Sequence, residues 1–357
     1  MDGKPMMNAP IISIGGRPIG AGCPCFVIAE AGINHNGDMG LAKQLIREAA
    51  GAGCDAVKFQ TYRTDAIAAL NAPMAEYQKV NAGFSGSQAD LLARCELGRE
   101  EHLQLMSECR DAGILFLSTP FDDPSLDLLK GIGVEALKIS SGDVTNIPFL
   151  KRMALLDVPL IVSTGMATVA EVSCAVEAIR GSGCDDFALL HCVSCYPAKP
   201  SECNLPAMKA LEREFGVSVG FSDHTEGFDI TLAAVAAGAT IIEKHITTDR
   251  SLPGPDHAAS IEPRELRAMM NSIRRVEAAL VGSEKNPSDA ELETAAVARK
   301  SLHFRGYLPS GSVLREEHLV AMRPGTGISP ACMGEILGKR LLRDAVEGTM
   351  LSMAMLK

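Results

Sequence analysis

In residues 217–224, Val-Ser-Val-Gly-Phe-Ser-Asp-His, a short apolar run ends in polar side chains, and residues 240–245, Thr-Ile-Ile-Glu-Lys-His, repeat the pattern. Six earlier apolar runs end in the same way and begin near residues 26, 55, 114, 135, 159 and 186. Helical patterns fill the intervals, as in Leu41 to Ala50. Eight buried strands that alternate with helices predict an α/β fold, the (β/α)8 or TIM barrel. Enzymes of this fold keep their active sites at the carboxyl ends of the strands, where these polar residues stand.

Length and composition predict a second, smaller domain after the barrel. A barrel takes about 250 residues, and the chain has 357. We assign it to residues 1–282, with a hairpin at Gly15-Gly16-Arg17-Pro18 that plugs its lower end. Residues 283–296 are predicted to be a linker, and residues 297–357 show short strand patterns broken by glycine and proline. A core this small is marginal, so we expect this domain to lean on a barrel, its own or a partner's.

Charge and hydropathy argue against two classes of partner, and cysteine usage indicates the redox compartment. The net charge of −10 argues against a nucleic-acid partner held through its phosphates. The longest nearly uninterrupted apolar stretch, Leu232 to Ile242, is too short to span a bilayer, so we expect no membrane association. Eleven cysteines without a paired framework or a secretory signal favour a reducing cytoplasm.

The polar strand ends share one register. Because side chains alternate along a strand, residues two apart face the same side. Each polar end has such a neighbour: Ile28 for Glu30, Ala56 for Lys58, Leu117 for Thr119, Ala136 for Lys138, Ile161 for Ser163, Cys192 for Ser194, Gly220 for Ser222 and His224, and Ile241 for Glu243 and His245. The register predicts that these neighbours fill the barrel while the polar strand ends emerge at its mouth.

Two lysines and several hydroxyls at one mouth predict an anion site. Lys58 and Lys138 supply positive charge. Directional donors for phosphate or carboxylate oxygens come from Thr119, Ser141, Ser163, Ser194 and Ser222. Each hydroxyl could instead cap the helix that follows its strand. That alternative is weaker for the lysines, because an inward lysine without an anion is costly to bury.

Two histidines close the last two strands. His224 and His245 stand on neighbouring strands about 4.8 Å apart, so both imidazoles can reach one metal ion. The alternative is a pair of hydrogen-bonded barrel histidines. Asp256, on the loop after the last strand, is a further candidate. Glu30 could act as general acid or base or could orient a substrate hydroxyl, and Asp143 is a similar case.

One interval between strands is unusually long. Thr61 to Gly98 leaves the catalytic face and contains a Gly-Phe-Ser-Gly-Ser stretch. Long loops inside compact domains are usually functional or disordered. We therefore interpret this segment as a substrate lid.

The motifs resemble a known family along nearly the whole chain. They are Ile28-Ala29-Glu30-Ala31-Gly32-Ile33-Asn34-His35-Asn36-Gly37, Ala56-Val57-Lys58-Phe59-Gln60, Ser118-Thr119-Pro120-Phe121-Asp122, Lys138-Ile139-Ser140-Ser141-Gly142-Asp143, Ser163-Thr164-Gly165-Met166, Leu190-His191-Cys192-Val193-Ser194-Cys195-Tyr196-Pro197, Gly220-Phe221-Ser222-Asp223-His224, Glu243-Lys244-His245 and Pro253-Gly254-Pro255-Asp256. In these motifs the chain resembles the sialic acid synthase family, which includes legionaminate and pseudaminate synthases. Ala298-Arg299-Lys300-Ser301 and Arg323 to Ser329 resemble that family's antifreeze-like (SAF) domain.

The resemblance implies a reaction and a role for each candidate residue. The family condenses phosphoenolpyruvate with an N-acetylated amino sugar and water, with cleavage of the C–O bond of phosphoenolpyruvate and release of phosphate. Phosphoenolpyruvate would be held by Lys58, Thr119, Lys138, Ser141, Ser163, Ser194 and Ser222. Mn²⁺ or Mg²⁺ would be held by His224 and His245. The sugar would contact Glu30, Asp143, Tyr196 and Asp256, with Tyr77 and Gln78 as weaker candidates in the lid.

The resemblance also implies a domain-swapped homodimer, in which Arg323 of one subunit reaches the N-acetyl group of a sugar in the other. Among the candidates we assign catalytic roles to Glu30, Lys58, Lys138 and Asp143. Two positions depart from some relatives, with Ser194 in place of Asn and Asp143 in place of Glu, so the sugar side is less fixed than the phosphoenolpyruvate side. The first choice of sugar is N-acetylmannosamine, which gives N-acetylneuraminate. The alternative is a 2,4-diacetamido-trideoxy hexose, which gives legionaminate or pseudaminate.

Two other functions compete with this hypothesis. One is an aldolase that forms a Schiff base through Lys58 or Lys138 and needs no metal. The other is a carbohydrate-binding or ice-binding protein without turnover, suggested by the antifreeze-like tail. A binding protein has no need of lysines, hydroxyls and two histidines that converge at one barrel mouth.

Overall fold

The computed structural model describes residues 9–67, 88–282 and 284–357. The chain divides into two compact units, Met1–Val281 and Gly282–Lys357.

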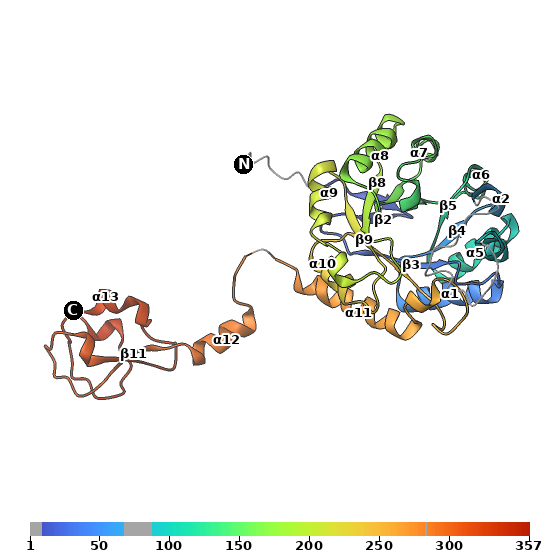
Figure 1. Cartoon of the computed structure of the whole chain (residues 1–357). Coiled ribbons are helices and arrows are strands. Elements are labelled where there is room, and N and C mark those ends of the chain that lie inside the picture. Colours follow the sequence, from blue (N-terminus) through green and yellow to red (C-terminus); the bar gives the residue numbers. More distant parts are fainter. Residues whose placement is uncertain (1–8, 68–87, 283) are drawn as a thin grey trace. The chain divides into compact units, whose positions relative to one another are not determined.

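The first unit is a barrel of eight parallel strands (Figure 1). In chain order they are β3 Phe26–Gly32, β4 Ala56–Thr61, β5 Leu115–Pro120, β6 Leu137–Ile139, β7 Leu160–Ser163, β8 Phe187–Cys192, β9 Val219–Asp223 and β10 Ile241–His245. Hydrogen-bonded neighbours follow the order β5-β4-β3-β10-β9-β8-β7-β6, and β5 and β6 at the two ends also lie side by side. The predicted barrel is confirmed, and each strand begins within about two residues of its expected start.

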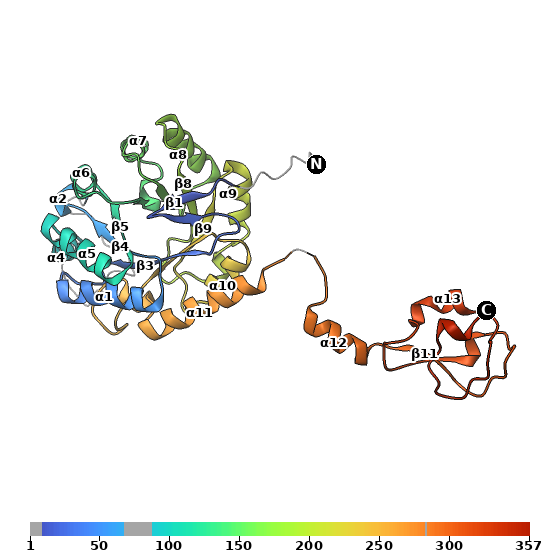
Figure 2. The ribbon, with the colours of Figure 1, turned by 180° about the vertical axis from the view of Figure 1, so that it is seen from behind.

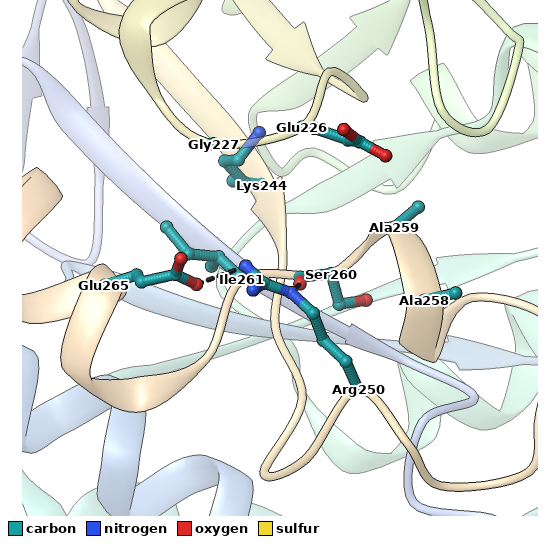
Figure 3. A pocket seen from close by; sticks show the side chains of 9 residues that line it. All are labelled: Glu226, Gly227, Lys244, Arg250, Ala258, Ala259, Ser260, Ile261 and Glu265. Atoms are coloured by element: carbon teal, nitrogen blue, oxygen red, sulfur yellow. Dashed lines mark hydrogen bonds and ion pairs between the residues drawn. The ribbon is translucent and has the colours of Figure 1, made fainter.

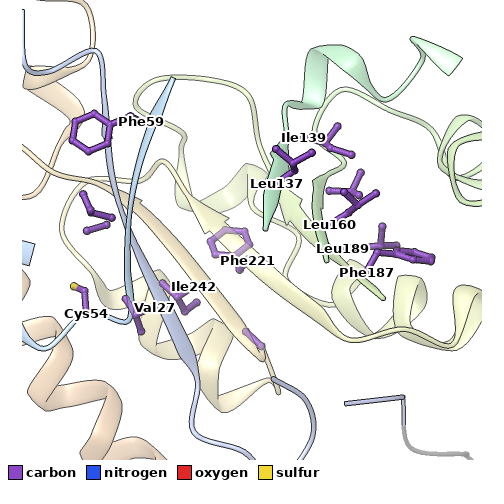
Figure 4. Close-up of a cluster of buried hydrophobic side chains, with 14 of the residues drawn as sticks. Val27, Cys54, Phe59, Leu137, Ile139, Leu160, Phe187, Leu189, Phe221 and Ile242 are labelled. Carbon is purple, nitrogen blue, oxygen red and sulfur yellow. The ribbon is translucent and has the colours of Figure 1, made fainter. Parts of the chain in front are cut away.

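The strand residues alternate between two apolar layers. Inside the barrel lie Ile28, Ala56, Leu117, Ala136, Ile161, Ala188, Leu190 and Ile241. Their strand neighbours, such as Val27, Phe59, Leu160 and Ile242, face outward and pack under the helices (Figure 4). The inside set matches the parity derived from the sequence, so the polar strand ends project from the interior at the mouth.

A hairpin fills the lower end of the barrel interior. Strands β1 Ile12–Ile14 and β2 Arg17–Ile19 pair antiparallel around Gly15 and Gly16. Ile12, Ile14 and Ile19 are buried in the same cluster as the inward residues of the barrel strands. Seen from behind, the hairpin crosses the barrel strands (Figure 2). This packing leaves the carboxyl ends of the strands as the open face.

Helices follow the strands, and most of them cover the outside of the barrel. They are α1 Met39–Ala52, α2 Thr64–Ile67, α4 Gln88–Cys95, α5 Arg99–Ala112, α6 Asp123–Ile132, α7 Ile147–Ala154, α8 Val169–Gly181, α9 Ala207–Phe215, α10 Asp229–Ala236 and α11 Pro263–Ala279. Local sequence sets their ends. Helix α6, for example, begins where Asp122 accepts a hydrogen bond from Ser125 N and ends at Gly133, whose φ of 76° suits glycine.

The second unit is built around one antiparallel pair, β11 Ser301–Phe304 and β12 Leu319–Met322, with a short helix α13 Met333–Ile336. Its core holds Leu302, Phe304, Leu314 and Leu351, among others. Most of the segment predicted to be a linker, residues 283–296, lies in helix α12 Asp289–Ala298. Ser288 and Glu291 start this helix with a reciprocal capping box, a local signal stronger than the polar composition around it.

Across residues 9–67, 88–282 and 284–357, no helix is long and apolar enough to cross a membrane.

Candidate active site

The polar strand ends meet in one cavity of about 370 Å³ at the mouth of the barrel. Of the residues predicted from the sequence, those that line it are Glu30, Lys58, Thr119, Lys138, Ser141, Ser163, Ser194, Tyr196, Ser222, His224, His245 and Asp256. Parallel pairing brings them together, because it sets Glu30 beside Lys58 and Ser222 beside Glu243. The structure thus gathers these residues, while the role of each stays a prediction.

Two buried lysines and two buried glutamates form the floor of the cavity. Lys58 Nζ lies 2.7 Å from Glu30 Oε2 and 3.7 Å from Glu243 Oε2. Lys138 Nζ lies 3.6 Å from Glu243 Oε1 and donates to Ser163 Oγ at 2.6 Å. Glu243 Oε1 also accepts a hydrogen bond from Ser222 Oγ at 2.9 Å. The lysines therefore have internal counter-ions, and their burial alone does not require a bound anion.

The two glutamates have opposite electrostatic environments. Burial would raise the pKa of Glu243, but Lys138 and Lys58 outweigh it and lower that pKa to about 2. For Glu30, burial dominates over the attraction of Lys58 and raises its pKa to about 7. Glu243 is therefore a permanent carboxylate, whereas Glu30 exchanges a proton near neutral pH.

The lysines differ as well. Burial would lower the pKa of Lys58, but Glu243 and Glu30 together raise it above its usual value. Burial lowers the pKa of Lys138, and the repulsion of Lys58 adds to this while Glu243 opposes it. Lys58 is thus the fixed positive charge of the cavity, and Lys138 is the more easily deprotonated lysine.

The two histidines face each other across the ends of β9 and β10. Their ring centroids are 5.5 Å apart, and the Tyr196 ring lies 4.2 Å from that of His224. His224 Nδ1 donates to Val193 O at 2.7 Å, so Nε2 is the acceptor nitrogen of the ring and lies 3.3 Å from Ser222 Oγ. Burial lowers the pKa of both histidines, that of His245 well below the ordinary value, so both rings are neutral.

This donor pair fits a divalent metal ion in its chemistry. Neutral imidazoles are the form that binds metals, and His245 Nδ1 is buried without a hydrogen-bond partner, 4.0 Å from Asp256 Oδ2. Within the described part of the chain, no group of three or more His, Cys, Asp and Glu side chains is arranged around a metal position. An ion held by these two histidines would therefore take its other ligands from substrate and water.

Some predicted residues do not line the cavity. After β6 the chain forms a one-turn helix, Ser141–Asp143, in which Ser140 Oγ accepts from Gly142 N. In this turn the Asp143 carboxylate accepts a hydrogen bond from Asn146 Nδ2 at 3.3 Å and is absent from the cavity lining. Tyr77, Gln78 and the central part of the predicted lid lie outside the described residues. Arg323 lies in the second unit, where its Nε donates to Ala298 O.

The structure adds residues to which sequence reasoning gave no role. Glu243 links both lysines to Ser222, and Gln60 lines the cavity with its Nε2 3.4 Å from Glu30 Oε1. Both shared the inward register of their strands, which was the available signal.

One edge of the cavity is apolar. Ile33, Leu92 and Phe121 line it, and behind them they pack with Tyr62 and Cys95. The Tyr62 hydroxyl donates to Leu92 O at 3.0 Å and ties α4 to the loop after β4. The cavity therefore combines a charged floor with a hydrophobic margin at the β3–β5 side.

Comparison with known proteins identifies the family to which the chain belongs. Residues 45–285 match the NeuB family, and residues 299–357 match the SAF domain. An N,N'-diacetyllegionaminic acid synthase of Legionella pneumophila is 46% identical over 94% of this chain and 95% of its own length. One of Campylobacter jejuni with the same name is 42% identical over 88% and 94%.

A solved structure agrees with the barrel and adds sequence similarity. The N-acetylneuraminic acid synthetase of Leptospira borgpetersenii, solved in complex with citrate, is 39% identical to this chain. It matches with a TM-score of 0.71 over 80% of this chain and 95% of that one. The family match, the identities and the coverage confirm the resemblance seen in the motifs, and the chain belongs to the NeuB family, with a TIM barrel followed by a SAF domain.

Proposed function

We propose that this protein condenses phosphoenolpyruvate with a 2,4-diacetamido-trideoxy hexose and water to give a diacetyllegionaminate and phosphate. The observation that carries the proposal is the 46% identity over nearly the full length of a relative named for that product, together with the cavity of charged and hydroxyl side chains. The first choice from the sequence was N-acetylneuraminate. The relatives that are 46% and 42% identical to this chain are named as legionaminic acid synthases, whereas the solved sialic acid synthetase is 39% identical. The higher identities favour the alternative product, legionaminate.

The floor of the cavity suits the anionic substrate. Lys58 and Lys138 provide charge, and the hydroxyls of Thr119, Ser163 and Ser222 surround them with donors. Ser141, Ser194 and Cys192 extend the same wall. Binding phosphoenolpyruvate here brings negative charge beside Glu30, which favours the protonated form of that residue.

The apolar margin suits the sugar we propose. A trideoxy hexose ends in a methyl group where N-acetylmannosamine has a hydroxymethyl group, and it carries one more acetyl methyl. Ile33, Leu92 and Phe121 offer these methyl groups a surface that needs no hydrogen bond. Glu30, Gln60 and Asp256 provide polar contacts for the remaining hydroxyl and amide groups.

A divalent ion fits the mechanism through His224 and His245. When bound there, Mn²⁺ or Mg²⁺ supplies Lewis acidity to the aldehyde oxygen of the open-chain sugar. The protein's own side chains do the rest of the positioning. Lys58, Lys138 and the hydroxyls hold phosphoenolpyruvate so that its methylene carbon faces the aldehyde carbon, a proximity effect.

The bond changes then balance as follows. A carbon–carbon bond forms between the methylene carbon and the aldehyde carbon, and the aldehyde oxygen gains a proton. Positive charge develops at the enol carbon, and the carboxylate of Glu243, a fixed negative charge in the floor of the cavity, favours that charge. Water adds to that carbon and gives up one proton, which balances the proton gained by the aldehyde oxygen. The new hydroxyl group then loses its proton as the keto C=O bond forms and the C–O bond to the phosphate group breaks, and phosphate leaves with that proton. Glu30, with a pKa of about 7, is placed to exchange protons during these steps.

The competing functions make different predictions. A Schiff-base aldolase would use Lys138, whose pKa is lowered by burial, and borohydride would trap its substrate covalently. A carbohydrate-binding protein would bind sugar without turnover. The relatives named by activity are synthases, which favours an enzyme.

The test is phosphate release from phosphoenolpyruvate with Mn²⁺, offering the legionaminate precursor, the pseudaminate precursor and N-acetylmannosamine in parallel. We expect the highest kcat/KM with the legionaminate precursor and loss of activity after chelation. A preference for N-acetylmannosamine would overturn the sugar assignment alone. Release that survives chelation would remove the metal, and no release with any sugar would overturn the synthase proposal.

A further inference from the structure

The residues that directly precede the two histidines in the chain form an ion pair. Asp223 precedes His224 at the end of β9, and Lys244 precedes His245 at the end of β10. The parallel register sets Lys244 beside Asp223. Because strand residues alternate, this pair faces away from the cavity that the histidines line, and neither residue belongs to its lining. Figure 3 shows Lys244 in a separate pocket with Glu226 and Arg250.

The pair is fully buried and fixes the backbone on both sides of His224. Asp223 and Lys244 are 1% and 2% exposed, and Lys244 Nζ lies 3.0 Å from Asp223 Oδ2. Lys244 Nζ also donates to Thr225 O at 2.8 Å, across from β10 to the chain beyond β9. Asp223 Oδ1 accepts from Thr225 N at 2.9 Å and from Thr225 Oγ1 at 2.7 Å. Asp223 Oδ2 accepts from Thr231 Oγ1 of α10 at 2.5 Å.

Stability alone does not account for this arrangement. Removing two charges from water carries a penalty that a well-packed apolar pair of the same volume avoids. What the ion pair adds is direction, since each hydrogen bond specifies where residues 223–225 and 244 lie. The peptide bonds from these residues lead straight to His224 and His245, whose ring centroids are 5.5 Å apart.

We propose that Asp223 and Lys244 are positioning residues, which hold His224 and His245 at the separation that lets both imidazoles bind one divalent ion. This inference rests on the metal site in the proposed function. It adds two residues that touch neither substrate nor metal and act through the backbone of β9 and β10.

The test measures Mn²⁺ binding directly, by the loss of the free-Mn²⁺ electron paramagnetic resonance signal as the full-length protein is added. The variants are Asp223→Asn, Lys244→Met and the double variant D223N/K244M, which leaves no unpaired buried charge. Melting curves without metal report the fold of each. The control is Glu265→Gln, because Glu265 pairs with Arg250 and lines the same pocket as Lys244 but does not adjoin a histidine.

We expect the double variant to fold and to bind Mn²⁺ about ten- to a hundredfold more weakly, the usual effect of residues that orient metal ligands, while E265Q binds as the original protein does. Equal Mn²⁺ affinity in the folded double variant would overturn the inference and leave the proposed function intact. Failure of the double variant to fold would show that the pair is only structural. Absence of Mn²⁺ binding by the original protein would overturn the metal part of the proposed function and this inference with it.

Discussion

Gly165 is a residue whose missing side chain shapes the anion end of the cavity. A Cβ atom there would lie 2.5 Å from Ser194 Oγ and 2.7 Å from Cys192 Sγ. We expect Gly165→Ala to raise the KM for phosphoenolpyruvate about tenfold or more, because the methyl group displaces donors that face the anion. The KM for the sugar should change little. Steady-state kinetics with each substrate varied in turn measures both.

Gly142 provides the matched control for this substitution. It lines the same cavity, but a Cβ on it would meet nothing nearer than Ser140 Oγ at 3.7 Å, an ordinary contact. Gly142→Ala should therefore leave the KM for phosphoenolpyruvate near its original value. An equal rise in both variants would mean that the cavity tolerates no change of backbone freedom, and the steric argument for Gly165 would be wrong.

His35 makes the stability of the barrel depend on pH. It is fully buried, its Nδ1 accepts from Gly37 N at 3.0 Å, and burial lowers its pKa to about 4 from an ordinary value of 6.5. The unfolded chain therefore takes up a proton between these two values when the folded one does not. The contribution of neutral, buried His35 to the free energy of unfolding is complete above pH about 6.5 and is lost as pH falls towards 4. Its size is on the order of 3 kcal/mol.

We expect the thermal midpoint of the full chain to fall between pH 6.5 and pH 4, and the fall to be shallower in His35→Asn. Asparagine keeps an acceptor near the position of Nδ1 but has no titrating group. His318, a partly exposed histidine of the second unit, serves as the control in His318→Asn. The explanation fails if the pH slope of His35→Asn equals that of the original protein.

At the scale of elements, the strands of the barrel were predictable and the turns were not. Parity is a local property of a strand, so Ile28 and Glu30 could be assigned to one side from the sequence alone. Asp143 follows β6 in a one-turn helix, and no alternation rule tells where that turn aims its carboxylate. The partnership of Lys58 with Glu243 depends on strands far apart in the chain, which a pattern within either strand does not contain.

Helix α4 carries a prediction about the choice of sugar. It presents Leu92 at the apolar margin of the cavity, fixed by the hydrogen bond from Tyr62. Leu92→Asn should raise the KM for the diacetamido sugar by about five- to thirtyfold, since methyl groups lose an apolar surface worth roughly 1–2 kcal/mol. The KM for phosphoenolpyruvate should stay constant, because its predicted ligands lie elsewhere.

Ala93, the next residue on α4, is exposed and does not line the cavity, so Ala93→Asn tests for effects of polarity on the helix itself. We expect it to behave as the original protein. If Leu92→Asn leaves the KM of the sugar unchanged, the margin does not contact the substrate. If the KM for both substrates rises equally, the helix has moved and specificity is not the cause.

At the scale of the whole molecule, the question is which barrel the second unit serves. Its residue Arg323 is exposed and donates through Nε to Ala298 O, and the sequence hypothesis assigns it to the sugar bound in the other subunit of a dimer. Two inactive variants can decide this. Arg323→Ala damages only the second unit, and Lys58→Ala damages only the barrel. If Arg323 reaches the partner's barrel, a dimer of one Arg323→Ala chain and one Lys58→Ala chain has one site with an intact barrel and an intact arginine.

Random pairing makes half of the dimers mixed, so co-expression of the two variants should restore about a quarter of the original activity, although each variant alone is inactive. If Arg323 serves its own barrel, every site in the mixed dimer carries one of the two defects, and no activity returns. Distinct affinity tags on the two chains allow the mixed dimers to be isolated first. Isolated mixed dimers show that the subunits assemble, so mixed dimers without activity would contradict the exchange of domains. Failure to isolate any mixed dimer would contradict the dimer itself.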